Sequence, residues 1–273
     1  IGRPEFGARA VDDWLLGNME LDRFRKEGWD AAAAAFRRVI DKAPDASMGY
    51  SSLARLNNGR HLMQPGLFRD DATHRESKEL ASQAVALDPL DALAHLHRAW
   101  ACCLLGEYDQ ASAGFAMARA CNANDPWVVL SSALGAAFSG EGELAQALSE
   151  RAIAEGWTTQ AFQWGFHTPI RFLSADYEGC VAAADEGGTA IINLPAWKAA
   201  ALWHLGREDE ARASWGTFAD LARAGWTGRD SPDPERICAW FLSCFPVRRP
   251  EARRRMAEGA SGAAGLQVHW AQQ

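Results

Sequence analysis

Histidines are the side chains of this chain best suited to hold a metal ion, and His95 and His97 are their closest pair. Their neighbourhood predicts a helix, on which side chains two residues apart point about 200° away from each other. The two rings therefore cannot share a metal ion. His95 takes a core-facing place where an aromatic side chain is usual, which predicts a packed histidine rather than a ligand.

The cysteine pattern and the absence of known catalytic motifs also argue against a metal site or a catalytic centre. The six cysteines form no C-x-x-C pair and stand among apolar residues of predicted helices: Cys102, Cys103, Cys121, Cys180, Cys238 and Cys244. We expect them to be reduced core residues. The sequence holds no phosphate-binding loop, dinucleotide fingerprint or H-E-x-x-H zinc motif, and only geometry would make a Ser-His-Asp arrangement credible. We expect a protein that is not an enzyme and that has no cofactor.

One basic cluster remains, near the end of the chain: Arg248, Arg249, Arg253, Arg254 and Arg255. Such a cluster could meet a phosphate backbone or an acidic partner. The alternative is the solvated face of a last helix, partly paired with Glu251 and Glu258. We favour the second interpretation.

The elements that would position these residues follow from an internal repeat. Gly140 follows Gly106 by 34 residues, and the pairs Ala111 and Ala145, and Ala118 and Ala152, keep the same interval. A constant period of this length indicates stacked helix pairs. A glycine can end the first helix of a pair with a positive φ, and small residues let the two helices approach each other closely.

The segment Leu104 to Ala120 resembles the tetratricopeptide repeat (TPR). Its glycine, aromatic and small residues match the TPR signature places: Gly106, Tyr108, Ala111, Phe115 and Ala118. The resemblance covers Val11 to about Leu266. It implies an all-α fold, a right-handed α-solenoid of about six TPR helix-turn-helix repeats with C-terminal capping helices.

We expect the following organisation along the chain. Residues 1–10 are a lead-in, because Ile1 to Phe6 read like a cloning remnant. Residues 11–225 form the TPR array, with a loop inserted at about 64–72, and residues 226–273 form a linker, capping helices and a tail. The first repeat should contain a helix from about Val11 to Arg25, a turn at Glu27 to Trp29 and a second helix to Pro44. The inserted loop is either a passive insertion, which we favour, or a functional one.

Two longer stretches resemble a particular group of TPR proteins. Ala86 to Trp100 and Cys244 to Gly259 look like parts of the C-terminal TPR modules of bacterial class III adenylate or guanylate cyclases and of winged-helix transcription activators. The resemblance implies a regulatory module, with an output domain of the parent chain as one possible partner.

Composition limits the other classes of function. The net charge is -7 and the pI is about 5.5, so nucleic acid is not expected as a partner of this fragment. The longest nearly apolar run, Val128 to Phe138, is far shorter than the ~20 residues that span a bilayer. We expect a cytoplasmic protein with no membrane contact.

In TPR proteins the first helices of the repeats line a concave groove, and certain places on each helix point into it. Those places hold mainly aromatic and apolar residues here; the candidate partner-binding residues are Trp14, Phe24, Arg55, Trp100, Trp127, Leu134, Phe162, Phe172 and Trp203. The Lys and Asn that clamp chaperone tails in some TPR domains are missing, since the matching places hold Gly17, Leu21, Ser51 and Arg55.

Two interpretations of the aromatic groove stay open. The aromatic side chains are exposed and bind a protein or peptide segment, or they pack on one another as core. The function we expect is a non-catalytic interaction or regulatory module. The alternative is a sensor for a small molecule or short peptide that changes the pitch of the superhelix.

Overall fold

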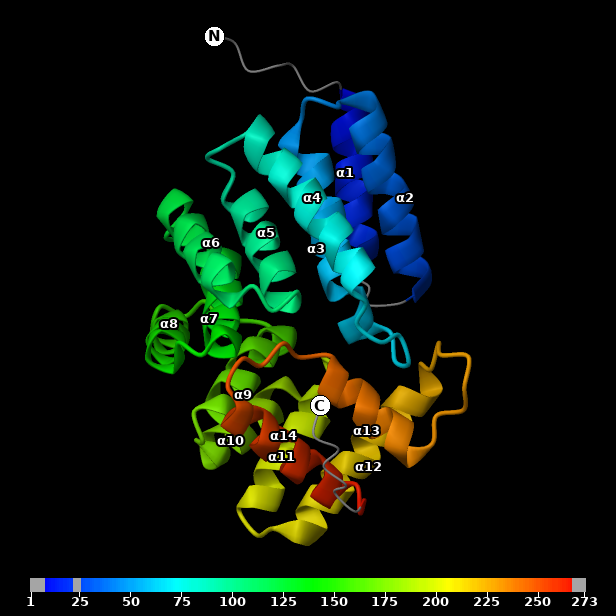
Figure 1. Ribbon diagram of the computed structural model, residues 1–273, viewed down its shortest axis with the longest axis vertical. Coiled ribbons are helices and arrows are strands. Elements are labelled where there is room, and N and C mark those ends of the chain that lie inside the picture. The colour runs from blue at the N-terminus through cyan, green and yellow to red at the C-terminus, as the bar shows by residue number, and fades with distance from the viewer. Residues whose placement is uncertain (1–7, 22–25, 267–273) are drawn as a thin grey trace. The chain divides into compact units, whose positions relative to one another are not determined.

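The protein is described here by a computed structural model, which covers residues 8–21 and 26–266. These residues form α-helices and one short 3-10 helix, with no β-strand among them (Figure 1). The elements are α1 (Ala8–Leu21), α2 (Lys26–Lys42), α3 (Ser47–Met63), α4 (Asp71–Leu87), α5 (Ala92–Leu104), α6 (Tyr108–Cys121), α7 (Pro126–Ser139), α8 (Gly142–Ala154), η1 (Ala161–Gln163), α9 (Trp164–Leu173), α10 (Tyr177–Gly187), α11 (Leu194–His204), α12 (Glu208–Ala224), α13 (Pro234–Ser243) and α14 (Pro250–Ala263).

The helices pack in successive pairs, α1 with α2, α3 with α4, α5 with α6, α7 with α8, α9 with α10 and α11 with α12. These are the expected six pairs, and α13 and α14 are the expected closing helices. The chain divides into two compact units. The first unit comprises Ile1–Met63 and Asp70–Ala123, which hold the first three pairs; the second comprises Gln64–Arg69 and Asn124–Gln273, which hold the last three pairs, α13 and α14.

The small residues lie where two helices of a pair meet. Ala111 and Ala118 of α6 are both fully buried, and Phe115 between them is 1% exposed. A Cβ placed on Gly114 would lie 2.8 Å from the Cβ of Ala99 on α5. The contact therefore has no room for larger side chains, which confirms the role predicted for the repeated alanines.

A left-handed residue closes the first helix in four successive pairs. Gly106, Gly140 and Gly206 have φ of +78°, +90° and +74°, and each donates its N–H to a carbonyl three residues earlier. At the fourth such place stands Ala175, with φ of +60° and the same bond to Phe172. Alanine has a Cβ that disfavours this conformation, by roughly 1–2 kcal/mol.

We predict that Ala175→Gly raises the free energy of unfolding of the second unit by about 1 kcal/mol, because the glycine removes this strain. Urea denaturation followed by circular dichroism measures the change. Ala182→Gly is the matched control, since Ala182 is exposed in the middle of α10, and it should lower stability by about 1 kcal/mol. A loss of stability in both variants would contradict the prediction.

The turn predicted at Glu27 to Trp29 is wrong, because these residues belong to α2. Gly28 instead allows a close helix contact: a Cβ there would lie 2.5 Å from the backbone oxygen of Glu20 on α1. A glycine near a helix start therefore serves packing here and not chain reversal. The end predicted for the first helix, at Arg25, lies outside the described residues.

Residues 64–69, in the loop between α3 and α4, belong to the second unit and form hydrogen bonds there. The Pro65 carbonyl accepts hydrogen bonds from the backbone N–H and the hydroxyl of Thr227, at 2.7 and 3.0 Å. The indole of Trp240 donates to the carbonyl of Leu67 at 3.2 Å. Gly66, with φ of +82°, packs on the Trp226 ring. These bonds give the loop a structural role in the second unit.

Candidate binding surfaces

The first helices of the first unit form one continuous face. Helix α3 packs against α1 on one side and against α5 on the other. Each of the three carries a predicted groove residue that is half-buried: Trp14 on α1, Arg55 on α3 and Trp100 on α5. We call the face that bears these three residues the first-unit wall. Phe24, also predicted for the groove, lies outside the described residues.

Hydrogen bonds hold polar groups of the first-unit wall in place. The indole Nε1 of Trp14 donates to Ser52 Oγ at 2.9 Å, which ties α1 to α3. The guanidinium of Arg55 donates to Asn18 Oδ1 at 3.3 Å, across the same two helices. Side chains held before a partner arrives lose less conformational entropy on binding.

His97 lies behind Arg55 and is a core residue. It is 4% exposed, and its Nδ1 is 3.0 Å from Ser51 Oγ. Burial, and next the charge of Arg55, lower the pKa of His97 to about 3. The imidazole is therefore neutral near pH 7.

This burial predicts acid sensitivity of the first unit. The pKa of His97 is about 3 in the folded chain, compared with 6.5 for an ordinary histidine. Below pH 6.5 the unfolded chain therefore binds more protons than the folded chain. The contribution of neutral His97 to the free energy of unfolding is fully present above pH 6.5, and it falls by about 1.4 kcal/mol per pH unit as the pH drops towards 3. Urea denaturation at about pH 7 and about pH 5 tests this. His97→Gln should flatten the profile, and an unchanged slope would contradict the assignment.

The first helices of the second unit also pack side by side, α7 with α9 and α9 with α11. Their predicted groove residues lie in different surroundings. Trp127 is half-buried and packs edge-on against Phe166, with ring centroids 5.4 Å apart. Leu134 packs on a buried cluster that includes Ile170, and Phe162 on η1 is half-buried.

Phe172 does not lie on a surface, which corrects its assignment to the groove. It is completely buried. Its ring packs on those of Tyr177, Trp197 and His204, at centroid distances of 5.4, 5.2 and 5.9 Å. At this position the interpretation of the aromatic residues as packed core is the right one.

Helix α14 lies along α11 and packs against Trp203 (Figure 1). A Cβ on Gly262 would come within 2.1 Å of the Trp203 ring, and one on Gly259 within 2.7 Å of the Ala200 carbonyl. The glycines of α14 therefore let the helix approach α11 closely. Trp203 is half-buried, because the protein's own last helix takes part of the surface that was predicted to be open.

The stretch before α14 extends this coverage to α7. The Phe245 ring packs on Phe138 of α7 and on Trp197 of α11, with centroids 5.8 and 4.7 Å apart. The backbone N–H of Arg248 donates to the Phe138 carbonyl at 2.8 Å. Residues 244–263, which we call the C-terminal segment, thus pack on the first helices of the second unit.

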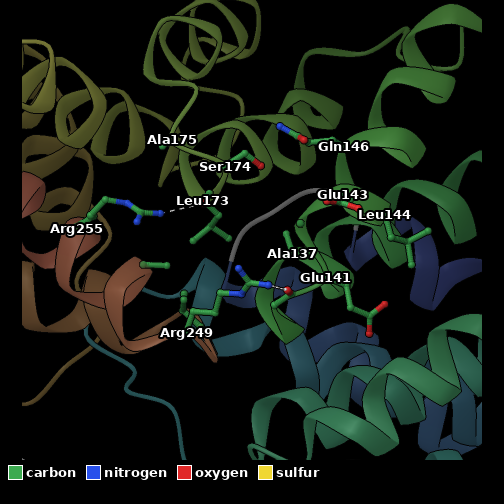
Figure 2. Close-up of a pocket in the computed structure, with 14 residues that line it drawn as sticks. Ala137, Glu141, Glu143, Leu144, Gln146, Leu173, Ser174, Ala175, Arg249 and Arg255 are labelled. Atoms are coloured by element: carbon green, nitrogen blue, oxygen red, sulfur yellow. Dashed lines mark hydrogen bonds between the residues drawn. The ribbon is translucent and has the colours of Figure 1, made fainter.

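A pocket of about 680 Å³ lies beside the C-terminal segment, within the second unit (Figure 2). It is bounded by the end of α7, the start of α8, the end of α9 and α14. The polar side chains on its lining are Glu141, Glu143, Gln146, Ser174, Arg249 and Arg255.

Both arginines of the pocket are held by carbonyl groups at helix ends. Arg249 donates to the Gly140 carbonyl, and Arg255 donates to that of Leu173 at 3.0 Å (Figure 2). In the described part of the chain neither is paired with Glu251 or Glu258. For these two arginines the predicted pairing is therefore wrong, whereas Arg253 and Arg254 are exposed on α14, as the predicted solvated helix face requires. The sequence showed the cluster, but nothing in it indicated the pocket.

Burial keeps three titratable groups of the second and first units in their uncharged forms. His167 is completely buried, and Ser149 Oγ and Thr158 Oγ1 lie 2.7 and 2.8 Å from its two ring nitrogens. Burial lowers its pKa to about 4, so it is a neutral packed residue. Burial also raises the pKa of the Cys102 and Cys238 thiols to about 11, which keeps both protonated.

Within residues 8–21 and 26–266, no three His, Cys, Asp or Glu side chains lie close enough together to hold a metal ion. No helix of this part of the chain has the length and apolar character needed to cross a bilayer.

Comparison with known proteins shows the fold. No family model and no curated protein matches the chain. Among solved structures it is similar to the Cut9-Hcn1 hetero-tetramer of the APC/C, with 13% identity and a TM-score of 0.58 over 96% of this chain and 51% of that chain. The chain is also similar to the type IV pilus biogenesis factor PilW, with 14% identity and a TM-score of 0.55 over 78% of this chain and 94% of that chain. Its similarity to PilF of Pseudomonas aeruginosa has 13% identity and a TM-score of 0.51 over 78% of this chain and 91% of that chain. The chain spans about half the length of the Cut9-Hcn1 chain. These likenesses confirm the predicted TPR solenoid.

Proposed function

We propose that this TPR solenoid is a non-catalytic interaction module, and that its first-unit wall binds a segment of another protein. One observation carries the proposal. Trp14, Arg55 and Trp100 are partly accessible on three adjacent first helices, whereas in the second unit Phe172 is completely buried and α14 packs against Trp203. Half-buried tryptophan and arginine side chains are the residue types that dominate binding energy at protein interfaces.

The C-terminal segment suggests the kind of ligand. It places small residues of a helix, Gly259 and Gly262, against the first helix α11. A helix with a stripe of small and apolar residues would fit the first-unit wall in the same manner. An acidic residue on that helix would pair with Arg55.

We further propose that the module belongs to a larger bacterial regulator in the cytoplasm, and that an output domain of the parent chain is a candidate partner. The support is the resemblance of Ala86 to Trp100 and of Cys244 to Gly259 to the TPR modules of cyclases and winged-helix activators. Measuring the affinity of the purified chain for a purified cyclase domain and for a purified winged-helix domain tests the idea.

The binding test compares the wild-type chain with Arg55→Gln and Trp100→Ala. Partners captured by the wild-type chain are purified and titrated against each variant. Loss of a charged or aromatic interface contact should weaken binding at least several-fold. Trp157→Ala is the control, because Trp157 is half-buried outside the first-unit wall. Trp100 also packs on Phe115, so Arg55→Gln separates lost binding from lost folding. Equal affinity for wild type and Arg55→Gln would contradict the proposal.

The pocket of the second unit favours a second candidate function, a sensor for a small molecule or short peptide. Its volume of about 680 Å³ is in the range of ligand sites. A ligand that binds the folded state raises the melting temperature by mass action, so a thermal-shift screen detects it. A screen with no hit, together with a purified protein partner, would favour the first candidate.

A further inference from the structure

We infer that the pocket of the second unit binds the carboxylate groups of an acidic peptide segment, with Arg249 and Arg255 as the anchoring cations. The inference is independent of the first-unit wall, because the two sites lie in different units. A protein that failed the Arg55 test would still bind here.

The first argument is that neither arginine of the pocket is paired with a carboxylate. Within the described chain, no carboxylate forms an ion pair with Arg249 or Arg255. Glu141 and Glu143 also line the pocket, yet neither pairs with these arginines. A guanidinium has five N–H donors, and the bonds to the Gly140 and Leu173 carbonyls and the contact of Arg255 with Tyr177 do not use all of them.

The second argument is that the two cations are already in position. A helix-end carbonyl fixes each guanidinium, and Figure 2 shows Arg255 extending towards Leu173 and Arg249 extending towards Glu141. The Nε of Arg255 is buried and has no hydrogen-bond partner in the protein. An unmatched buried donor is costly, and a ligand oxygen would remove that cost. Guanidinium groups bind carboxylates through two parallel hydrogen bonds.

The surroundings favour a peptide over a small acid. Outside the pocket the positive charge continues: the Arg248 side chain lies beside Gly140, and Arg253 follows Arg249 by one turn of α14. Both are exposed. A chain with several acidic residues can contact the pocket and these flanking arginines together, which one small carboxylate cannot do.

The remaining lining residues favour a peptide over nucleic acid. Leu144, Leu173 and Val247 offer apolar contact to the methylene groups of a glutamate side chain. Glu141 and Glu143 can accept hydrogen bonds from peptide N–H groups, and they repel the closely spaced phosphates of a nucleic acid more strongly than carboxylates that uncharged residues separate along a peptide. The net charge of -7 also opposes a long polyanion.

The test uses the whole chain and a fluorescein-labelled peptide that alternates glutamate with glycine and leucine. Fluorescence anisotropy measures its dissociation constant at low ionic strength. A peptide with glutamine in place of every glutamate should bind at least about tenfold more weakly. Arg249→Gln and Arg255→Gln should each weaken the acidic peptide by about tenfold or more, and Arg249→Lys should weaken it less because the charge is retained.

Arg254→Gln is the matched control, since Arg254 is exposed on α14 and does not line the pocket. It removes the same charge from the same helix and should leave the affinity within about twofold. Three results would each overturn the inference. Arg254→Gln could weaken the acidic peptide as much as Arg249→Gln does, the glutamine peptide could bind as tightly as the acidic one, or a single-stranded DNA of equal charge could bind more tightly. Free glutarate that competes as strongly as the peptide would overturn the peptide assignment. Thermal melts of each variant verify folding.

Discussion

Replacing Trp197 with alanine is expected to lower the free energy of unfolding of the second unit by about 3–5 kcal/mol. The Trp197 side chain is only 1% exposed. Its ring contacts those of Phe172 on α9, Phe241 on α13 and Phe245 in the C-terminal segment, with centroids 5.2, 5.4 and 4.7 Å apart. Alanine would leave a cavity among three elements that surround one ring, and a close-packed core refills such a space poorly.

Urea denaturation followed by circular dichroism measures the effect. Trp157→Ala is the matched control because it deletes the same side chain where it is half-buried in a loop, and it should cost about 1 kcal/mol. Trp197→Phe should fall between alanine and the wild type, since it restores part of the volume. If the two alanine variants lose similar stability, Trp197 does not hold these elements together.

The second large effect is expected from Gly259→Val. A Cβ on Gly259 would lie 2.7 Å from the Ala200 carbonyl and 2.9 Å from its Cα, so the obstacle is backbone that cannot rotate away. We expect a loss of about 3 kcal/mol and partial release of α14 from α11. Trypsin followed by mass spectrometry measures the release, because the helix itself carries Arg253, Arg254 and Arg255. Cleavage after these residues should become faster than in the wild type.

Gly216→Val is the control for this variant. Gly216 lies within α12, and a Cβ there would meet nothing within 4 Å. The same substitution should therefore leave both stability and trypsin cleavage close to the wild type. Resistance of Gly259→Val to trypsin would show that α14 tolerates the added side chain. If α14 is released, Trp203 becomes more exposed than its present half-buried state, and a partner of the first-unit wall can then be tested for binding to the second unit.

The fold could be predicted from the sequence because each part of the pattern acts locally. The glycines at 106, 140 and 206 end helices through their own φ angles, and the alanines at 111 and 118 are buried by the neighbouring helix of the same pair. These effects depend on residues within one repeat, so a period of 34 residues shows them directly. The one turn that was predicted wrongly, at Glu27 to Trp29, failed because a glycine can serve either a turn or a close helix contact.

The candidate sites could be predicted only in part. Periodicity indicates which face of a helix points away from its own partner helix, and on that basis Trp14, Arg55 and Trp100 were assigned to a wall. It does not show what a distant segment places on that face. Phe172 and Trp203 satisfied the same pattern, yet the first is buried in the core and the second is half-buried against α14.

The sequence by itself determined the helices, their pairing and the lack of recognisable catalytic motifs, since these depend on local spacing. Tertiary structure decided which of the predicted groove residues are accessible, how the chain divides into two units and where Arg249 lies. That arginine bonds to Gly140, which is 109 residues away along the chain. No local pattern encodes such a contact, because it depends on how the C-terminal segment packs on helices formed much earlier in the chain.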